Sequence, residues 1–384
     1  MPGNRPEDFL QRAREASGLS DFGESETFLV GLRLLCLDLD DAPALDDINR
    51  ERLIGAIGMH LINRLRLVEE RRTHPEICAE EIQGPLVVIG LPRTGTTAMV
   101  DLLAQDPAAR APTQWETGNL FPPPNKTTWA QDPRIAALQA QMDAAAPTDP
   151  MVAQGLHIPG ALLPDECNSF IGPEFWSPNL AVMANLPRYS EWLRWAAPAR
   201  PYLTHRWVLQ HLQHYGPSGR WTLKSPFHVH ALPAFLAEYP NAVFVQTHRA
   251  PTALMPSMCG LYCTIRGEGP GDPRRAVTGK ELCAVWGTGM QRAMSARLDP
   301  ALNARVFDVS HRSMIEDPMG TVRSVYTRCD LPFSAAAEAA VAAWLANPAQ
   351  HMSKVKFTLE DFGLDEDEVT AAFGPYSERY KDYF

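Results

Sequence analysis

The sequence predicts an α/β fold with a mainly parallel central sheet and helices on both faces. Short apolar runs rich in β-branched residues recur at 86–89, 242–248 and 306–309, and helical segments separate them. Such alternation favours parallel strands, because crossover helices join consecutive strands. We expect a helical N-terminal extension over 1–80, and an α/β domain over 81–384 with a helical, aromatic-rich insertion at about 120–215.

Composition restricts the class of protein. With 384 residues, 45% of them hydrophobic and 21% charged, the chain can build a substantial core. A net charge of −10 argues against nucleic acid as a partner. No signal pattern or bilayer-length apolar stretch appears, so we expect no stable membrane insertion. Seven scattered cysteines without a CxxC pair predict free thiols in the cytoplasm, and the oligomeric state stays open.

The extension and the insertion are predicted to be helical. Apolar residues keep helical spacing from Phe28 to Leu39, and a broad apolar stripe follows over 54–67. The insertion is rich in aromatic residues, including Trp176 and Tyr202. An aromatic cover suits an apolar acceptor molecule, although aromatic residues at these spacings also occur as ordinary core.

One stretch of the α/β part has the pattern of an anion site. An apolar strand over 86–89 runs into a turn bounded by Gly90 and Gly95, and a helix begins near Thr96. Unpaired N–H groups and the helix dipole converge at such a helix start. The spacing nearly matches the nucleoside-triphosphate loop G-x-x-x-x-G-K-[ST], but Thr96 stands where that loop has lysine. The cation lies inside the turn, at Arg93.

Further strands and helices follow in alternation. The predicted strands cover 111–116, 221–224, 242–248 and 306–309, and the predicted helices cover 135–145, 229–238, 251–262, 279–297 and 318–329, with a loop at 266–275. In open parallel sheets the ligand binds beyond the carboxyl ends of the strands. Four charged side chains are predicted at these ends: Arg93, Glu116, Lys224 and Arg249.

Arg249 and Ser257 form a second candidate anion site. An arginine at a strand end and a serine eight residues later, two turns into the next helix, can both reach one anion. Lys224 ends a strand beside the first anion loop, where its ammonium can stabilise charge on a leaving phosphate. An acceptor hydroxyl needs a base, and Glu116 is the candidate.

These motifs resemble those of sulfotransferases that use 3′-phosphoadenosine 5′-phosphosulfate (PAPS), whose fold is P-loop-like. Their phosphosulfate loop is a Lys or Arg, a small residue and Gly-Thr-Thr, which matches the run from Arg93 to Thr97. The resemblance implies that Arg93, Thr94, Gly95, Thr96 and Thr97 hold the 5′-phosphosulfate. It also implies that Arg249 and Ser257 hold the 3′-phosphate and that Lys224 is catalytic. We expect Lys224 and Arg93 to stabilise the departing phosphate. Lys354 and Lys356 precede a segment similar to the family's closing segment, and we expect either to close over the phosphates.

The base has an alternative. Bacterial and tyrosylprotein members of the family place a glutamate near the position of Glu116, whereas cytosolic members use a histidine two residues after the lysine. That position is Pro226 here, so His228 is the alternative base. His228 and His230 have no third ligand nearby in sequence, and we predict no metal.

The resulting hypothesis is an enzyme. The predicted sulfotransferase moves a sulfuryl group from PAPS to a hydroxyl of a small, hydrophobic acceptor and releases 3′,5′-adenosine bisphosphate. Two alternatives stay open: a P-loop-type small-molecule kinase, which Thr96 disfavours, and a non-catalytic nucleotide-binding protein.

Overall fold

The computed structural model describes residues 4–25, 27–41, 45–156, 158–197, 200–347 and 356–384. The chain divides into two compact units. The first unit comprises Met1–Ile82, Glu116–Ala130 and Cys167–Gly216, and the second comprises Gln83–Trp115, Gln131–Glu166 and Pro217–Phe384. The predicted division into an extension and a domain with one insertion stays a prediction.

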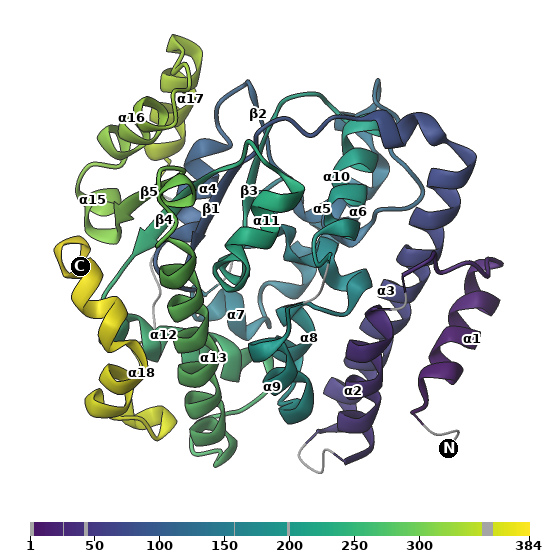
Figure 1. Cartoon of the computed structure of the whole chain (residues 1–384), viewed down its shortest axis with the longest axis horizontal. Coiled ribbons are helices and arrows are strands. Elements are labelled where there is room, and N and C mark those ends of the chain that lie inside the picture. Colours follow the sequence, from purple (N-terminus) through teal and green to yellow (C-terminus); the bar gives the residue numbers. More distant parts are fainter. Residues whose placement is uncertain (1–3, 26, 42–44, 157, 198–199, 348–355) are drawn as a thin grey trace. The chain divides into compact units, whose positions relative to one another are not determined.

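The second unit contains a five-stranded sheet with the strand order β2-β3-β1-β4-β5 (Figure 1). Its strands are β1 (Leu86–Gly90), β2 (Ala109–Arg110), β3 (Arg220–Lys224), β4 (Val243–His248) and β5 (Val306–Ser310). Every neighbouring pair is parallel. This confirms the predicted parallel sheet, whose carboxyl ends all meet at one edge.

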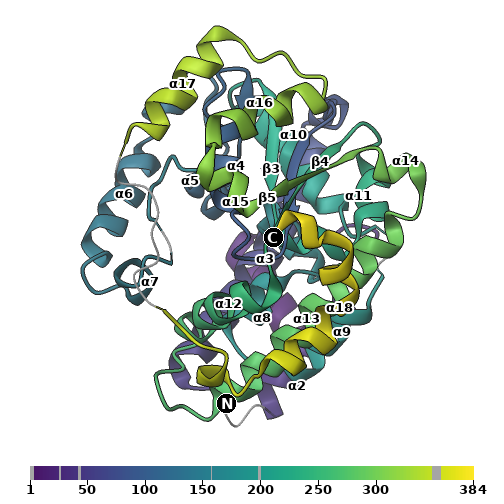
Figure 2. The same cartoon turned by 90° about the vertical axis from the view of Figure 1, so that its left-hand side faces the viewer.

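Helices cover both faces of this sheet. One layer consists of α4 (Thr96–Leu103), α15 (His311–Glu316), α16 (Pro318–Arg328) and α17 (Ala335–Leu345) (Figure 2). Their apolar side chains bury Val88, Val245 and Val309 of the sheet. The opposite layer contains η4 (Pro226–His230), α11 (Leu232–Glu238), α12 (Pro251–Ile265), α13 (Arg274–Ala296) and α18 (Glu366–Tyr380). There the rings of Phe235 and Phe244 lie 5.5 Å apart.

Short elements complete the second unit: α6 (Pro133–Ala145), α7 (Pro150–Ala153), α14 (Pro300–Asn303), η5 (Glu360–Phe362) and η6 (Lys381–Tyr383). The elements α5 (Gln114–Gly118) and η2 (Trp129–Gln131) run across the boundaries between the units.

The described part of the first unit is helical, as the sequence predicts. It contains α1 (Pro6–Ser17), α2 (Phe28–Asp41), α3 (Asp47–Thr73), η1 (Pro75–Ala79), η3 (Cys167–Glu174), α8 (Pro178–Met183), α9 (Pro187–Trp195) and α10 (Leu203–Tyr215). A buried ion pair of 2.9 Å between Arg64 and Glu174 joins α3 to η3. Trp176, Tyr189 and Tyr202 are each at most 1% exposed, so these aromatic side chains belong to the core of this unit.

Several predicted boundaries are wrong. The second strand was expected over 111–116, but β2 ends at Arg110 and Glu116 lies in α5. Pro112 has no N–H to donate to a strand ladder, which explains the early end. The helix expected over 229–238 is interrupted, because α11 starts at Leu232, with Pro233 in its first turn, after the separate turn η4. The helix α13 begins at Arg274, five residues before its predicted start.

None of the described helices combines the length and the apolarity needed to cross a membrane. All seven cysteines are free thiols.

Candidate active site

The loop between β1 and α4 has a backbone that only glycine adopts easily at two positions. Gly90 and Gly95 have φ values of 134° and 93°. A Cβ on Gly90 would lie 2.5 Å from the carbonyl oxygen of Thr247, so β1 and β4 could not approach as they do. Gly95 immediately precedes α4 and, as a glycine, has no side chain that could cap the helix. The first N–H groups of α4 therefore stay available to an anion.

Thr94 holds this loop against β4. Its hydroxyl lies 2.6 Å from the carbonyl oxygen of Leu91 and 2.6 Å from the hydroxyl of Thr247. The side chain of Thr94 is fully buried and faces the sheet. Thr96 is also buried, whereas Thr97 is exposed. The roles of these three threonines as cofactor ligands stay predictions.

Arg93, Ser257 and Arg249 lie together at the carboxyl edge of the sheet. The Nε atom of Arg93 donates to the hydroxyl of Ser257 at 3.0 Å, and Nη1 of Arg249 donates to the carbonyl oxygen of Arg93 at 3.3 Å. The structure thus joins the two anion sites that the sequence predicts separately.

The two arginines form a local concentration of positive charge. Burial and the charge of Arg249 lower the pKa of Arg93, and burial lowers the pKa of Arg249. Within the described part of the chain, neither guanidinium forms an ion pair with a carboxylate. An anion placed between them would relieve the mutual repulsion of the two guanidinium groups.

His311 belongs to the same cluster and was missed by the sequence analysis. It is the first residue of α15 and directly follows β5. Burial, then the charges of Arg249 and Arg93, lower its pKa to about 4. His311 follows the strand predicted at 306–309, and ligands bind beyond the ends of such strands, so its position in the sequence also indicates a ligand contact.

Lys224 ends β3 and contacts a second residue that the sequence analysis missed. Its Nζ lies 2.8 Å from Oε1 of Glu166 and 3.4 Å from the hydroxyl of Thr97. Lys224 is almost fully buried, and Glu166 is partly exposed. No local pattern marks Glu166, because it is 58 residues from Lys224 in the sequence.

Asp101 is buried one turn along α4 from Thr97. Burial raises the pKa of its carboxyl to about 7, although the charge of Lys224 acts in the opposite direction. The cation of Lys224 therefore lies near two carboxyl groups of the second unit, those of Glu166 and Asp101.

Glu116 and His228 are the two bases considered from the sequence. Glu116 belongs to the first unit, where its buried carboxylate accepts a hydrogen bond of 2.9 Å from Nε1 of Trp129. Burial lowers the pKa of His228 to about 3, which makes its imidazole a weak base. The ring of Phe235 lies 4.8 Å from that imidazole. The role of Glu116 as the base stays a prediction.

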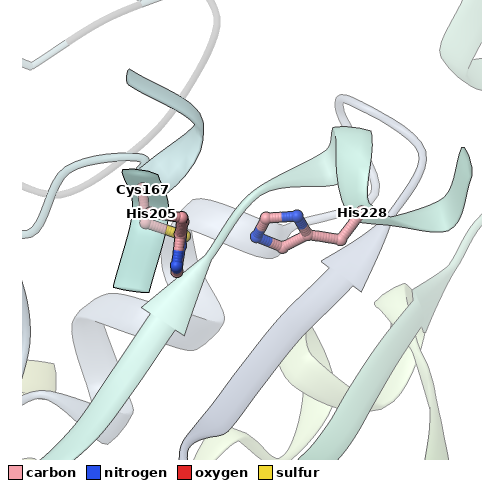
Figure 3. Close-up of side chains that lie close together, drawn as sticks. All are labelled: Cys167, His205 and His228. Carbon is pink, nitrogen blue, oxygen red and sulfur yellow. The ribbon is translucent and has the colours of Figure 1, made fainter. Parts of the chain in front are cut away.

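Figure 3 draws His228 of η4 together with Cys167 of η3 and His205 of α10. His228 belongs to the second unit, and the other two residues belong to the first. The prediction that the protein holds no metal therefore stays a prediction. Lys356 is exposed, and Lys354 lies outside the described residues.

Comparison with known proteins decides the family. The family model described as "Sulfotransferase family" matches residues 85–335, which include the anion loop, Lys224, Arg249, Ser257 and His311. The chain belongs to the sulfotransferase family. It is therefore a transferase, and its parallel sheet is the P-loop-like sheet of sulfotransferases.

Two solved structures of bacterial sulfotransferases are similar to this chain. Sulfotransferase STF9 from Mycobacterium avium is 26% identical, with a TM-score of 0.88, and the match covers 98% of this chain and 97% of that one. Sulfotransferase STF1 from Mycobacterium tuberculosis H37Rv is 29% identical, with a TM-score of 0.80, and the match covers 97% and 98%. A search among curated proteins finds no significant match.

Proposed function

We propose that this sulfotransferase uses PAPS as its donor and a hydroxyl group of a small molecule as its acceptor. The observation that carries this proposal is the connected group of Arg93, Ser257 and Arg249. Two guanidinium groups and a hydroxyl beside a helix start suit a ligand with more than one phosphate. PAPS has a phosphate at its 3′ position and a phosphosulfate at its 5′ position.

The chain's own residues fit such a ligand. The absence of a Cβ at Gly95 lets Met314 pack directly against the loop, because its Cε would lie 2.3 Å from that Cβ. Arg93 and the first N–H groups of α4 would hold the phosphosulfate, and Arg249 with Ser257 would hold the 3′-phosphate. When bound, PAPS would supply the sulfuryl group that the acceptor oxygen attacks.

Lys224 and a carboxylate would then perform the proton and charge chemistry. The ammonium of Lys224 next to Thr97 can stabilise negative charge that develops on a phosphate held by the loop. The base must take the proton of the acceptor hydroxyl. Glu116 is the base predicted from the sequence, and Glu166 is a second candidate because it lies 2.8 Å from Lys224.

The nature of the acceptor stays a prediction. The aromatic side chains that suggested a hydrophobic acceptor are largely buried in the core of the first unit, and this weakens the support for that suggestion. A hydroxyl acceptor would need a general base near the sulfuryl group, and Glu116 and Glu166 are the candidates. The cytoplasmic location is likewise a proposal, consistent with seven free thiols.

A melting experiment tests the donor. A ligand that binds only the folded chain stabilises it by about 2.7 kcal/mol at a concentration of 100 times its Kd. We expect 3′,5′-adenosine bisphosphate to raise the Tm strongly, and ATP with magnesium to have little effect. Strong protection by ATP with magnesium and little by the bisphosphate would favour the alternative function, a small-molecule kinase. In this chain Thr96 stands at the position where the kinase loop has a lysine.

The variant Arg249→Ala should weaken binding of the bisphosphate by about 1.5–3 kcal/mol, the range for a hydrogen bond to a charged group. Arg323→Ala is the matched control, because this exposed arginine of α16 pairs with Glu338 on the surface. An unchanged affinity in Arg249→Ala would contradict the assignment of the 3′-phosphate.

A further inference from the structure

His311 lies where a ligand of the anion loop would lie. The register pairs His248 with Ser310, so Arg249 and His311 directly follow paired residues of neighbouring strands. Cδ2 of His311 lies 3.2 Å from the position that a Cβ on Gly95 would occupy. The imidazole therefore lies against Gly95, the residue of the phosphosulfate loop that immediately precedes α4.

A cavity of about 380 Å³ opens beside this histidine. Its lining includes Arg249, which directly follows β4, Ala253 of α12, His311 and Ile315 of α15, and Phe384. Six of the lining residues are titratable, and Arg249 and His311 are two of them. The charge of Arg249 acts on His311, so the two side chains lie near each other.

The charged and titratable groups around His311 are mostly cationic. Arg93 of the loop and Arg249 at the end of β4 both lower the pKa of His311. The remaining titratable groups that line the cavity are His248 of β4, Arg312 and Glu316 of α15, and Tyr383 of η6. With a pKa of about 4, the imidazole is neutral near pH 7 when no anion is bound.

We propose that His311 is a further ligand of the phosphate held by Arg249 and Ser257, and that it takes up one proton when that phosphate binds. This inference rests on the proposed function, because it needs a phosphorylated ligand at Arg249. A phosphate dianion offsets the two guanidinium charges and favours the protonated imidazole. The proton comes from solvent and adds to a ring nitrogen, and no other bond changes.

Proton uptake makes binding depend on pH. Between the pKa of His311 in the free protein and its higher pKa in the complex, only the complex carries the proton. In that pH range the Kd of the bisphosphate should rise by up to about tenfold per pH unit. The ligand acts in the opposite direction, because a phosphate monoester loses its second proton near pH 6. The comparison of the native protein with a variant at position 311 removes this contribution, since the ligand is the same in both.

Calorimetry measures the proton directly. We would titrate the full chain with 3′,5′-adenosine bisphosphate at pH 7 in buffers of different ionisation enthalpy and obtain the number of protons taken up. The variant His311→Gln should take up fewer protons than the native protein, with a difference of up to one. The control His74→Gln, which removes an exposed histidine that contacts Glu76, should match the native protein.

The outcomes separate this inference from the proposed function. If the native protein fails to bind the bisphosphate at all, the proposed function is wrong. If native protein and His311→Gln both bind with equal proton uptake, the inference is wrong and the donor assignment stands.

If His311→Gln no longer binds, NMR titration of the native His311 imidazole decides the question. Its pKa should rise when the bisphosphate is added, and an unchanged pKa would overturn the inference.

Discussion

At the scale of single residues, the backbone of Arg93 is as informative as its charge. Arg93 has a φ of 69°, in the left-handed region that residues with a Cβ rarely occupy. Its carbonyl oxygen accepts a hydrogen bond from Arg249, and its side chain reaches Ser257. These contacts hold an unfavourable conformation in place, which is typical of residues that position a ligand.

The identity of the base is a prediction at this scale. Glu116→Ala should abolish turnover yet preserve binding of the bisphosphate if Glu116 takes the proton. Glu166→Gln tests the alternative, because it keeps a hydrogen-bond acceptor beside Lys224 and removes the carboxylate. Turnover with labelled PAPS and the bisphosphate-induced shift of Tm should be measured for both variants. Full turnover in Glu116→Ala would exclude that residue as the base and leave Glu166 and His228.

At the scale of elements, α18 is joined to the carboxyl ends of β4 and β5 by a buried polar network. The imidazole of His248 lies 3.0 Å from the hydroxyl of Tyr376 on α18 and 2.7 Å from a carboxylate oxygen of Asp308 on β5. Arg297, which directly follows α13, donates to both oxygens of Asp308 at 2.6 and 2.7 Å. Because His248 precedes Arg249, this network also holds the strand end that presents Arg249.

Breaking this network should destabilise the protein. The hydrogen bonds from Arg297 and His248 lower the pKa of Asp308 to about 2 despite its burial. Asp308→Asn leaves the nearly buried guanidinium of Arg297 without its counter-charge, and such losses cost about 3–5 kcal/mol. Urea unfolding measures the change. Glu378→Gln, which removes an exposed ion pair with Lys381, is the control and should leave the unfolding midpoint unchanged. Equal midpoints for Asp308→Asn and the native protein would contradict the structural role of the network.

Much of the second unit could be predicted from the sequence, because its signals are local. The run from Leu86 to Gly95 combines a buried strand, two glycines and a helix start within ten residues. The pair of Arg249 and Ser257 is also local, since one strand end and two helical turns contain it. Glu166 could not be found in this way, because folding brings it to Lys224 from a distant segment. His311 directly follows β5, so its position at a strand end is a local signal. The position of Glu116 on a helix rather than a strand is explained by Pro112, which cannot donate an N–H to a strand ladder.

At the scale of the whole molecule, both units bury neutral histidines. Burial lowers the pKa of His60 in the first unit to about 4, and of His228 and His230 in the second unit to about 3. The unfolded chain therefore binds protons on these histidines below pH 6.5, whereas the folded chain does not until the pH reaches about 3–4. The contribution of these histidines to the free energy of unfolding should be fully present above pH 6.5 and should decrease as the pH falls below that value.

A variant at His230 tests this dependence. Its ring lies 4.8 Å from Phe227 and 5.6 Å from Trp286, and neither ring nitrogen finds a hydrogen-bond partner among the described residues. His230→Phe keeps the packing and removes one titrating group. The slope of unfolding free energy against pH between 6 and 4 should decrease by up to about 1.4 kcal/mol per pH unit. Urea unfolding at several pH values measures it, and an unchanged slope would show that His230 does not contribute.

The paired arginines at the anion loop have a consequence for the lifetime of the protein. Two half-buried guanidinium groups that repel each other raise the free energy of the folded chain, and a bound anion offsets that cost. Degradation in a cell draws on the small unfolded population, which shrinks as ligand binds. An anion bound at these two arginines would therefore slow the loss of the protein as well as occupy its site.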